Sequence, residues 1–290
     1  MLNNTTKFFE KKIFNLLVRV RQFFYREKTS YPFLSGDSFA QLCEVAVYGK
    51  RKVLPSEIIA AKTIFCPSER VEDLLENHGE NISAKILVLG NTDRDFYDLA
   101  CKFPASVEAV YLQNSHISDN FFHTLPIGIE NIRYGRNGLT SLFDYPYSQQ
   151  RKLNKILVGP FSPTHLEREE LIAWSEVDNP RIHFLSQHLL PRKLARLAST
   201  FMFVACPRGN GTDTHRFWET LYRGSIPVVK ETEWSRSIAD LGVPLIQLKE
   251  WDFSEFSEIT AKYKFESFDP RKIPVLWMTH WQEVFGLNTK

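Results

Sequence analysis

Short apolar runs alternate with amphipathic stretches along most of this chain, and this alternation restricts the possible folds more than any other feature. In the first half the apolar runs predict strands at Thr63 to Cys66, Ile86 to Leu89, Val107 to Leu112 and His123 to Ile129. Residues 71–77 and 95–102, between them, have the periodicity of helices. Strands that alternate with helices form parallel sheets that are covered on both faces. We therefore expect an α/β domain here.

The same alternation restarts after a polar, aromatic stretch from Asp144 to Lys152, which indicates a domain boundary. Strands are expected at Ile156 to Val158, Ile182 to Leu185, Phe201 to Ala205, Ile226 to Val229 and Leu245 to Leu248. Helices are expected at Leu166 to Trp174, Pro191 to Ala198, His215 to Arg223 and Trp234 to Asp240. A chain of 290 residues is too long for one ordinary domain and suits two. The predicted architecture is two Rossmann-like domains that face a cleft.

Four segments follow from these patterns. They are a basic arm over residues 1–28, an N-terminal domain over 29–150, a C-terminal domain over 151–270 and a C-terminal helix over 271–290. The last segment is rich in aromatic residues, and we expect it to pack across the junction of the two domains.

The positive charge of the chain is concentrated in the basic arm. The whole chain has 36 basic and 34 acidic residues, which gives no sign of a nucleic-acid-binding surface. Residues 1–28 contain seven basic and two acidic groups, and residues 7–26 have the pattern of an amphipathic helix. Arg19 interrupts the apolar run, so this helix is too short to cross a membrane. Its apolar face suits either an anionic membrane surface or the body of the protein.

The four cysteines lie far apart, and no histidine stands beside them at a zinc-binding spacing. This usage favours a reducing compartment and thiols that are buried as small apolar groups.

The stretch from Phe201 to Lys230 contains the most informative motif. An apolar strand ends at Pro207, a loop rich in small residues follows, and Thr212 to Thr214 offer caps for the next helix. A helix that begins after such a loop presents unpaired backbone N–H groups and the positive end of its dipole. The loop therefore predicts a site for a phosphate or a diphosphate.

The charged residues of this motif suggest which part of the ligand each of them binds. Arg208 and Arg216 provide forked hydrogen bonds for a diphosphate, and Glu219 can accept hydrogen bonds from ribose hydroxyls. Their spacing lets His215, Arg216 and Glu219 face the strand ends together. The predicted donor-binding residues are Arg208, Gly209, Asn210, Gly211, Asp213, His215, Arg216 and Glu219.

Residues Cys206 to Val229 resemble the signature of the exostosin-like glycosyltransferases, which has a C-P-R-G-x-G loop, a helical Arg and Glu, and a G-x-I-P-V-V strand. Ser35 to Phe39, Asn91 to Asp93 and Leu125 to Asn131 are similar to pieces of bacterial and viral members. The resemblance implies a GT-B fold with no essential metal or cofactor. It also implies inverting transfer from a nucleotide-diphosphate sugar to a glycan or lipid-linked acceptor, in surface polysaccharide or glycoconjugate synthesis. Without a spanning anchor, a cytoplasmic enzyme at the inner face of a membrane is expected.

Several alternatives remain open at this point. The general base that such a transfer requires is expected to be Asp37, Asp93 or His116 in the N-terminal domain. Asp93 and Asp95 form a D-x-D pair that would hold a divalent ion in a metal-dependent transferase, although helix capping also explains Asp95. A membrane-associated module that binds nucleotide sugars without catalysis is the non-enzymatic alternative.

Overall fold

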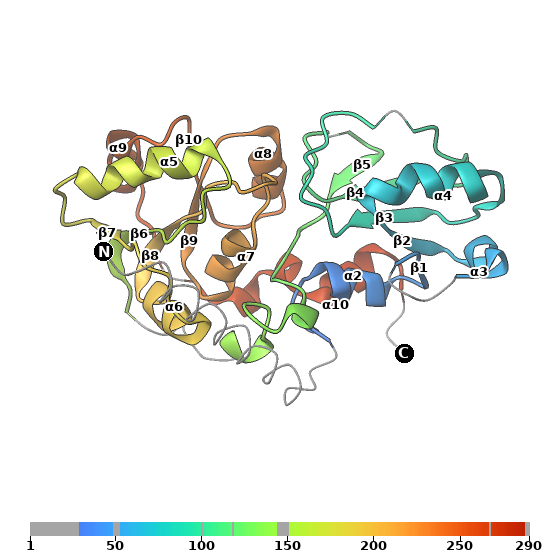
Figure 1. The fold of residues 1–290 in the computed structure, drawn as a ribbon, viewed down its shortest axis with the longest axis horizontal. Helices are drawn as coiled ribbons and strands as arrows, with labels where there is room; N and C mark the ends of the chain where they lie inside the picture. The colour runs from blue at the N-terminus through green and yellow to red at the C-terminus, as the bar shows by residue number, and fades with distance from the viewer. Residues whose placement is uncertain are drawn as a thin grey trace, which may run out of the picture.

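The computed structural model describes residues 29–48, 53–99, 101–117, 119–143, 151–266 and 268–287. These residues form a mixed α/β fold with two parallel sheets of five strands each. The sheets lie in separate halves of the molecule, side by side in Figure 1. We call residues 29–143 the N-terminal half and residues 151–270 the C-terminal half. The α/β class that the sequence predicts is confirmed.

The strands of the N-terminal sheet stand in chain order, β1-β2-β3-β4-β5, and all neighbours are parallel. They are β1 (Val45–Ala46), β2 (Thr63–Pro67), β3 (Ile86–Gly90), β4 (Ala109–Leu112) and β5 (Phe122–Thr124). The central strands β2 and β3 are buried along nearly their whole length, as expected for near-continuous apolar runs in a parallel sheet.

Four helices cover the two faces of this sheet: α2 (Gly36–Leu42), α3 (Pro55–Ala60), α4 (Val71–His78) and α10 (Met278–Val284). Ile58 of α3 and Leu74 of α4 pack on one face. Phe39 of α2 and Trp281 of α10 pack on the other, with their rings 5.4 Å apart. Right-handed crossovers between strands in chain order all lie on one face. The opposite face is therefore covered by the helix that precedes β1 and by one from the far end of the chain.

Two sequence-based expectations in this half are wrong. Residues 95–99 and 101–102 do not form the expected helix. The Phe96 amide instead donates to the Asn114 carbonyl and the His116 amide to the Phe96 carbonyl, so Phe96 forms an isolated parallel bridge with Ser115. The strand expected to reach Ile129 ends at Thr124, and the chain then turns through Gly128 at a φ of +69°.

The strands of the C-terminal sheet stand in a different order, β10-β9-β8-β6-β7, again all parallel. They are β6 (Leu153–Val158), β7 (Ile182–Phe184), β8 (Phe201–Ala205), β9 (Ile226–Lys230) and β10 (Ile246–Leu248). The chain runs outward from β6 to β7 and then returns past β6 to β8. The strand order therefore reverses between the neighbours β6 and β8.

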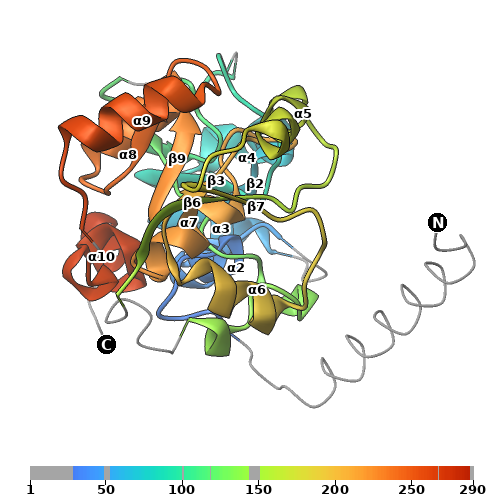
Figure 2. The same cartoon turned by 90° about the vertical axis from the view of Figure 1, so that its left-hand side faces the viewer.

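The helices of the C-terminal half are α5 (Leu166–Ile172), α6 (Pro191–Ala198), α7 (His215–Tyr222), α8 (Glu233–Asp240) and α9 (Phe253–Lys262). Helices α5 and α9 pack on one face of the sheet through Leu171 and Phe256. Helices α6, α7 and α8 pack on the other, and Figure 2 shows α5 and α9 above the sheet with α6 and α7 below it. Helix α5 follows β6 and helix α7 follows β8, so the connections from these neighbouring strands lead to opposite faces of the sheet. They leave a crevice at the carboxyl ends of the two strands.

An aromatic cluster joins the two halves at the base of the molecule. Phe33, Phe143 and Trp277 surround Tyr222 of α7, with ring centroids 5.1 to 5.7 Å from the tyrosine ring. The Tyr222 hydroxyl accepts a hydrogen bond from the Leu34 amide and donates one to the Leu276 carbonyl. The aromatic C-terminal segment thus forms a helix that packs on the N-terminal half, across the junction of the two halves.

Candidate functional site

The loop between β8 and α7 carries the motif that the sequence singles out, and its two glycines are buried under other parts of the chain. A Cβ on Gly209 would lie 2.7 Å from Nη2 of Arg168 in α5. A Cβ on Gly211 would lie 2.7 Å from Oδ1 of Asn114 in the N-terminal half. The sequence suggests a loop that is open to a ligand. In the structure, the space beside the two glycines is occupied by the side chains of Arg168 and Asn114. The backbone at these glycines is therefore packed against protein groups.

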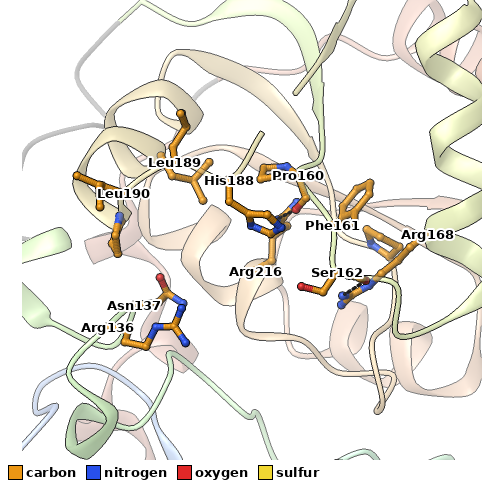
Figure 3. Close-up of a pocket in the computed structure, with 13 residues that line it drawn as sticks. Arg136, Asn137, Pro160, Phe161, Ser162, Arg168, His188, Leu189, Leu190 and Arg216 are labelled. Carbon is orange, nitrogen blue, oxygen red and sulfur yellow. Dashed lines mark hydrogen bonds between the residues drawn. The ribbon is translucent and has the colours of Figure 1, made fainter. Parts of the chain in front are cut away.

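A cavity of about 570 Å³ lies at the reversal of strand order in the C-terminal sheet. Its walls come from the segments that follow β6, β7 and β8 and from a loop of the N-terminal half. The described lining residues are Arg136, Asn137, Pro160, Phe161, Ser162, Arg168, His188, Leu189, Leu190, Pro191, Leu194, Pro207 and Arg216. They include three arginines and no aspartate or glutamate. Because this cavity lies where the strand order switches direction, we call it the switch-point cavity. In Figure 3, Arg136 and Asn137 border it on the side opposite Ser162 and Arg168.

Arg216 is held rigidly at the centre of this wall. It lies in the first turn of α7, and its guanidinium donates to the Gly159 carbonyl at 3.1 Å and to the Pro160 carbonyl at 2.7 Å. The group also stacks over the Phe161 ring, with its Cζ atom 5.0 Å from the ring centroid. Burial lowers the pKa of Arg216 from its ordinary value. A guanidinium has five N–H donors, so the two carbonyls fix its orientation and leave donors for a ligand.

Arg168 is the second fixed cation, and no motif or spacing in the sequence singles it out. Its Nε donates to the Arg208 carbonyl at 2.8 Å and its Nη1 to the Ser162 carbonyl at 3.0 Å. Burial and then the charge of Arg216 lower its pKa. Two like charges of this kind favour an anion between them. The signal that could have found Arg168 is its place on the helix after β6, but only the strand order shows that β6 adjoins β8.

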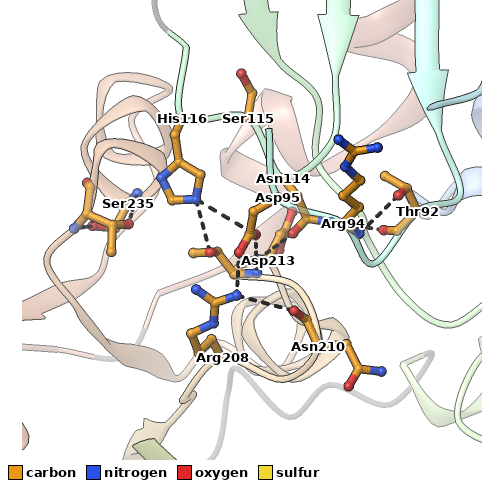
Figure 4. A network of polar contacts seen from close by, with 12 residues as sticks. Thr92, Arg94, Asp95, Asn114, Ser115, His116, Arg208, Asn210, Asp213 and Ser235 are labelled. Atoms are coloured by element: carbon orange, nitrogen blue, oxygen red, sulfur yellow. Dashed lines mark hydrogen bonds and ion pairs between the residues drawn. The ribbon is translucent and has the colours of Figure 1, made fainter. Parts of the chain in front are cut away.

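Arg208 is predicted to bind the diphosphate with Arg216, and the structure places it elsewhere. Its guanidinium forms an ion pair with Asp95, which also accepts a hydrogen bond from the Thr212 amide at 2.9 Å (Figure 4). Burial by itself would raise the pKa of Asp95, but hydrogen bonds from His116 and Thr212 and the charge of Arg208 lower it to about 2. Arg208 therefore ties the loop to the N-terminal half and does not line the switch-point cavity.

Asp213 and Glu219, both predicted to bind the donor, also have protein partners. Asp213 is buried, and its carboxylate accepts hydrogen bonds from the Ile127 amide and from Nε1 of Trp218 at 2.8 and 2.7 Å. Burial raises the pKa of Asp213 to about 7, and these donors oppose the rise. Glu219 forms an ion pair with Arg223 at 3.3 Å and does not line the cavity.

A second cavity, of about 450 Å³, reaches the same helix from the N-terminal half. It is lined by Asp93 and His215 among other residues. Asp93 is exposed, and its carboxylate accepts a hydrogen bond of 3.3 Å from Nδ2 of the exposed Asn210. Asn210, predicted to bind the donor, therefore faces the N-terminal half. His215, predicted for the same role, borders this second cavity.

The other two candidates for the general base lie outside both cavities. Asp37 accepts hydrogen bonds from Arg133 and from the Tyr48 hydroxyl, and burial raises its pKa. His116 contacts the Thr212 hydroxyl at 3.1 Å and stacks on the Tyr97 ring at a centroid distance of 4.3 Å. The structure thus brings Asp93 to a cavity and sets Asp37 and His116 in contacts between protein groups.

Asp93 and Asp95, the D-x-D pair, have separate partners in Asn210 and Arg208. Within the described ranges, no three residues of the types His, Cys, Asp and Glu are grouped closely enough to hold a metal ion. The same ranges contain no helix with the length and apolar character needed to cross a bilayer. The basic arm, whose residues 7–26 are expected to contact either an anionic membrane surface or the body of the protein, lies outside the described residues.

Known protein families were compared with the chain, and none of their models matches it; no curated protein matches it either. The resemblance to the exostosin-like enzymes therefore depends on the residues of the loop, the helix and the strand themselves. The chemistry of the two cavities is the remaining guide to function.

Proposed function

We propose that the protein is a glycosyltransferase of the GT-B type, which binds a nucleoside-diphosphate sugar in the switch-point cavity. The transferred sugar would go to a hydroxyl of a glycan or a lipid-linked acceptor. The observation that carries this proposal is the pair of fixed arginines, Arg168 and Arg216, at the carboxyl ends of two neighbouring strands where the strand order reverses. Open α/β sheets bind nucleotides at such a point.

The charge and size of the cavity support a diphosphate as the anchoring group. Arginines bind phosphate oxygens through forked hydrogen bonds, and the described lining contains no carboxylate that would repel an anion. The volume of about 570 Å³ lies within the ordinary range for small-molecule sites, about 300 to 1,000 Å³. Phe161 and the leucines that follow β7 provide apolar surface for a base or a sugar ring.

The same two arginines suit the chemistry of sugar transfer. As the bond between the anomeric carbon and the diphosphate breaks, negative charge collects on the leaving phosphate oxygens. Because carbonyl groups already fix the orientation of Arg168 and Arg216, these cations need little reorganisation to stabilise that charge.

A thermal-shift panel tests the donor proposal. The probes are UDP, GDP and dTDP, UDP-glucose, UDP-N-acetylglucosamine and GDP-mannose, with the matching monophosphates as controls. A diphosphate ligand at a hundred times its Kd should stabilise the fold by about 2.7 kcal/mol. Since each kcal/mol moves Tm by about 2 to 4 °C in a chain of this size, Tm should rise by roughly 5 °C or more.

Two variants make the test specific. Arg216→Lys keeps the charge but removes the fork, and Arg168→Ala removes one cation. Each should weaken binding of the stabilising nucleotide about ten- to a hundredfold in calorimetry, the value of one charge-assisted hydrogen bond. Arg94→Ala, an exposed arginine after β3 in the N-terminal half, is the control and should bind normally. A panel without any stabilising diphosphate would contradict the proposal, as would full affinity in both cavity variants.

A further inference from the structure

The second cavity differs from the switch-point cavity in charge. Three carboxylates border it, from Glu69, Asp93 and Glu130, and the C-terminal half contributes His215. Arg133 also borders it, but this side chain forms an ion pair with Asp37 at 2.5 Å. The cavity therefore presents hydrogen-bond acceptors and a net negative charge, which suits hydroxyl or amino groups and disfavours anions.

A backbone carbonyl fixes the orientation of the His215 ring. Nδ1 lies 2.8 Å from the Gly128 carbonyl oxygen. A carbonyl can only accept a hydrogen bond, so Nδ1 carries the hydrogen. In the neutral ring Nε2 is then the unprotonated atom with a lone pair. Among the described residues, none forms a hydrogen bond with this Nε2.

The Gly128 carbonyl is itself held firmly. Gly128 has a φ of +69°, and a Cβ there would lie 2.1 Å from the Leu34 carbonyl oxygen, so only glycine fits. On either side of it, the Ile127 amide donates to Asp213 and the Ile129 amide donates to the Leu34 carbonyl. The loop that orients His215 is thus clamped to both halves.

The position of His215 on α7 connects the two cavities. His215 and Arg216 are consecutive in the first turn of the helix, so their side chains diverge by about 100°. His215 borders the acidic cavity, and Arg216 borders the switch-point cavity. A sugar whose diphosphate is bound by Arg216 has its anomeric carbon one bond from that diphosphate. The reacting carbon would therefore lie close to the boundary that these two residues mark.

We infer that the acidic cavity receives the acceptor and that His215 is the general base of the transfer; this rests on the proposed function. Nε2 takes the proton of the acceptor hydroxyl, and the hydroxyl oxygen forms a bond to the anomeric carbon. The bond from that carbon to the diphosphate oxygen breaks, and its electron pair leaves on the diphosphate bound by Arg216. The acceptor class that fits three carboxylates is a neutral glycan or an amino sugar.

His215→Asn provides the direct test. The asparagine Nδ2 can occupy the place of Nδ1 and donate to the Gly128 carbonyl, whereas nothing replaces Nε2. We expect the release of nucleoside diphosphate from the nucleotide sugar that binds best to fall by a factor of about 10² to 10⁴. The Kd for that donor and the Tm should stay at wild-type values. In His215→Ala, added imidazole should restore part of the lost rate.

The acceptors and controls define the remaining outcomes. Water, methyl glucoside, methyl glucosaminide and methyl glucuronide serve as acceptors, and the glucuronide should react slowest. His183→Asn, an exposed histidine on β7, is the matched control and should keep full activity. If His215→Asn turns over donor at the wild-type rate, the inference is overturned. The same holds if Asp93→Asn or His116→Asn loses turnover while His215→Asn keeps it. A protein that binds or turns over no nucleotide sugar would instead contradict the proposed function.

Discussion

The carboxyl ends of the two sheets use their polar residues in opposite ways. In the C-terminal half, Arg168 and Arg216 donate hydrogen bonds only to backbone carbonyls among the described residues, and both border a cavity. In the N-terminal half, Asp95 and Asn114 bind residues of the loop between β8 and α7. The polar residues of one edge thus border a cavity, and some of those at the other edge bind the protein itself.

Strand order explains this difference. The C-terminal sheet reverses its order between β6 and β8, so the helices after these neighbouring strands lie on opposite faces and leave a crevice. The N-terminal sheet keeps chain order from β1 to β5 and has no such reversal. Its polar groups after β3 and β4, Asp95 and Asn114, contact the loop of residues 206–214 instead.

The largest expected effect is a loss of stability in Arg208→Ala, and comparison with Arg168→Ala distinguishes the two edges. Arg208→Ala removes the cation that faces Asp95, and because both side chains are mostly buried, it leaves a poorly solvated carboxylate. We expect the free energy of unfolding to fall by about 3 kcal/mol, measured by urea denaturation. Nucleotide affinity should change little.

Arg168→Ala should give the reverse result, with weaker nucleotide binding and a smaller loss of stability. If Arg208→Ala proves to weaken binding while leaving stability intact, the loop contributes to the ligand site as the sequence suggests, and the contrast between the two edges fails.

The second prediction concerns the pH dependence of the same contact. The pKa of Asp95 is lowered from its ordinary value of 3.8 to about 2 in the folded protein, where His116, Thr212 and Arg208 stabilise the carboxylate. Between these values the unfolded chain binds more protons, so stability is complete above about pH 4 and is lost as the pH falls toward 2. The loss should be on the order of 2 kcal/mol. Asp95→Asn should show a shallower fall than wild type when unfolding is measured from pH 5 to pH 2.

The sequence predicts the elements of the C-terminal half well because their signals are local. The strand Phe201–Ala205 and the helix Pro191–Ala198 begin and end at the expected residues. The helix expected over residues 95–102 does not form because two other contacts compete with it. The Thr92 hydroxyl accepts a local hydrogen bond from the Arg94 amide, and Phe96 forms a parallel bridge with the distant Ser115. The second contact depends on the chain that follows β4, which the local pattern does not show.

The candidate site shows the same division between local and distant signals. Arg216 follows from the order of strand, loop and helix, and the structure places it at the cavity. Arg208 looks equivalent in the sequence, but its partner Asp95 lies 113 positions away, and no local spacing indicates the pair. The sequence does not indicate Arg168, because this residue lies near Arg216 only when β6 is next to β8 in the sheet. Strand order and distant pairing are properties of the fold that periodicity does not encode.

The smallest expected effect tests whether the glycines of the loop serve the protein contact. Gly211→Ala would place a Cβ 2.7 Å from Oδ1 of Asn114, the atom that accepts a hydrogen bond from the Asp213 amide. Asn114 is fully buried and its Nδ2 donates to the Thr92 carbonyl, so its amide cannot turn aside freely. We expect a loss of about 1 to 2 kcal/mol of stability in urea denaturation. Gly79→Ala, which has open space around its Cβ position, is the control and should leave stability nearly unchanged. A stable Gly211→Ala variant that binds nucleotide poorly would instead place the ligand against this loop.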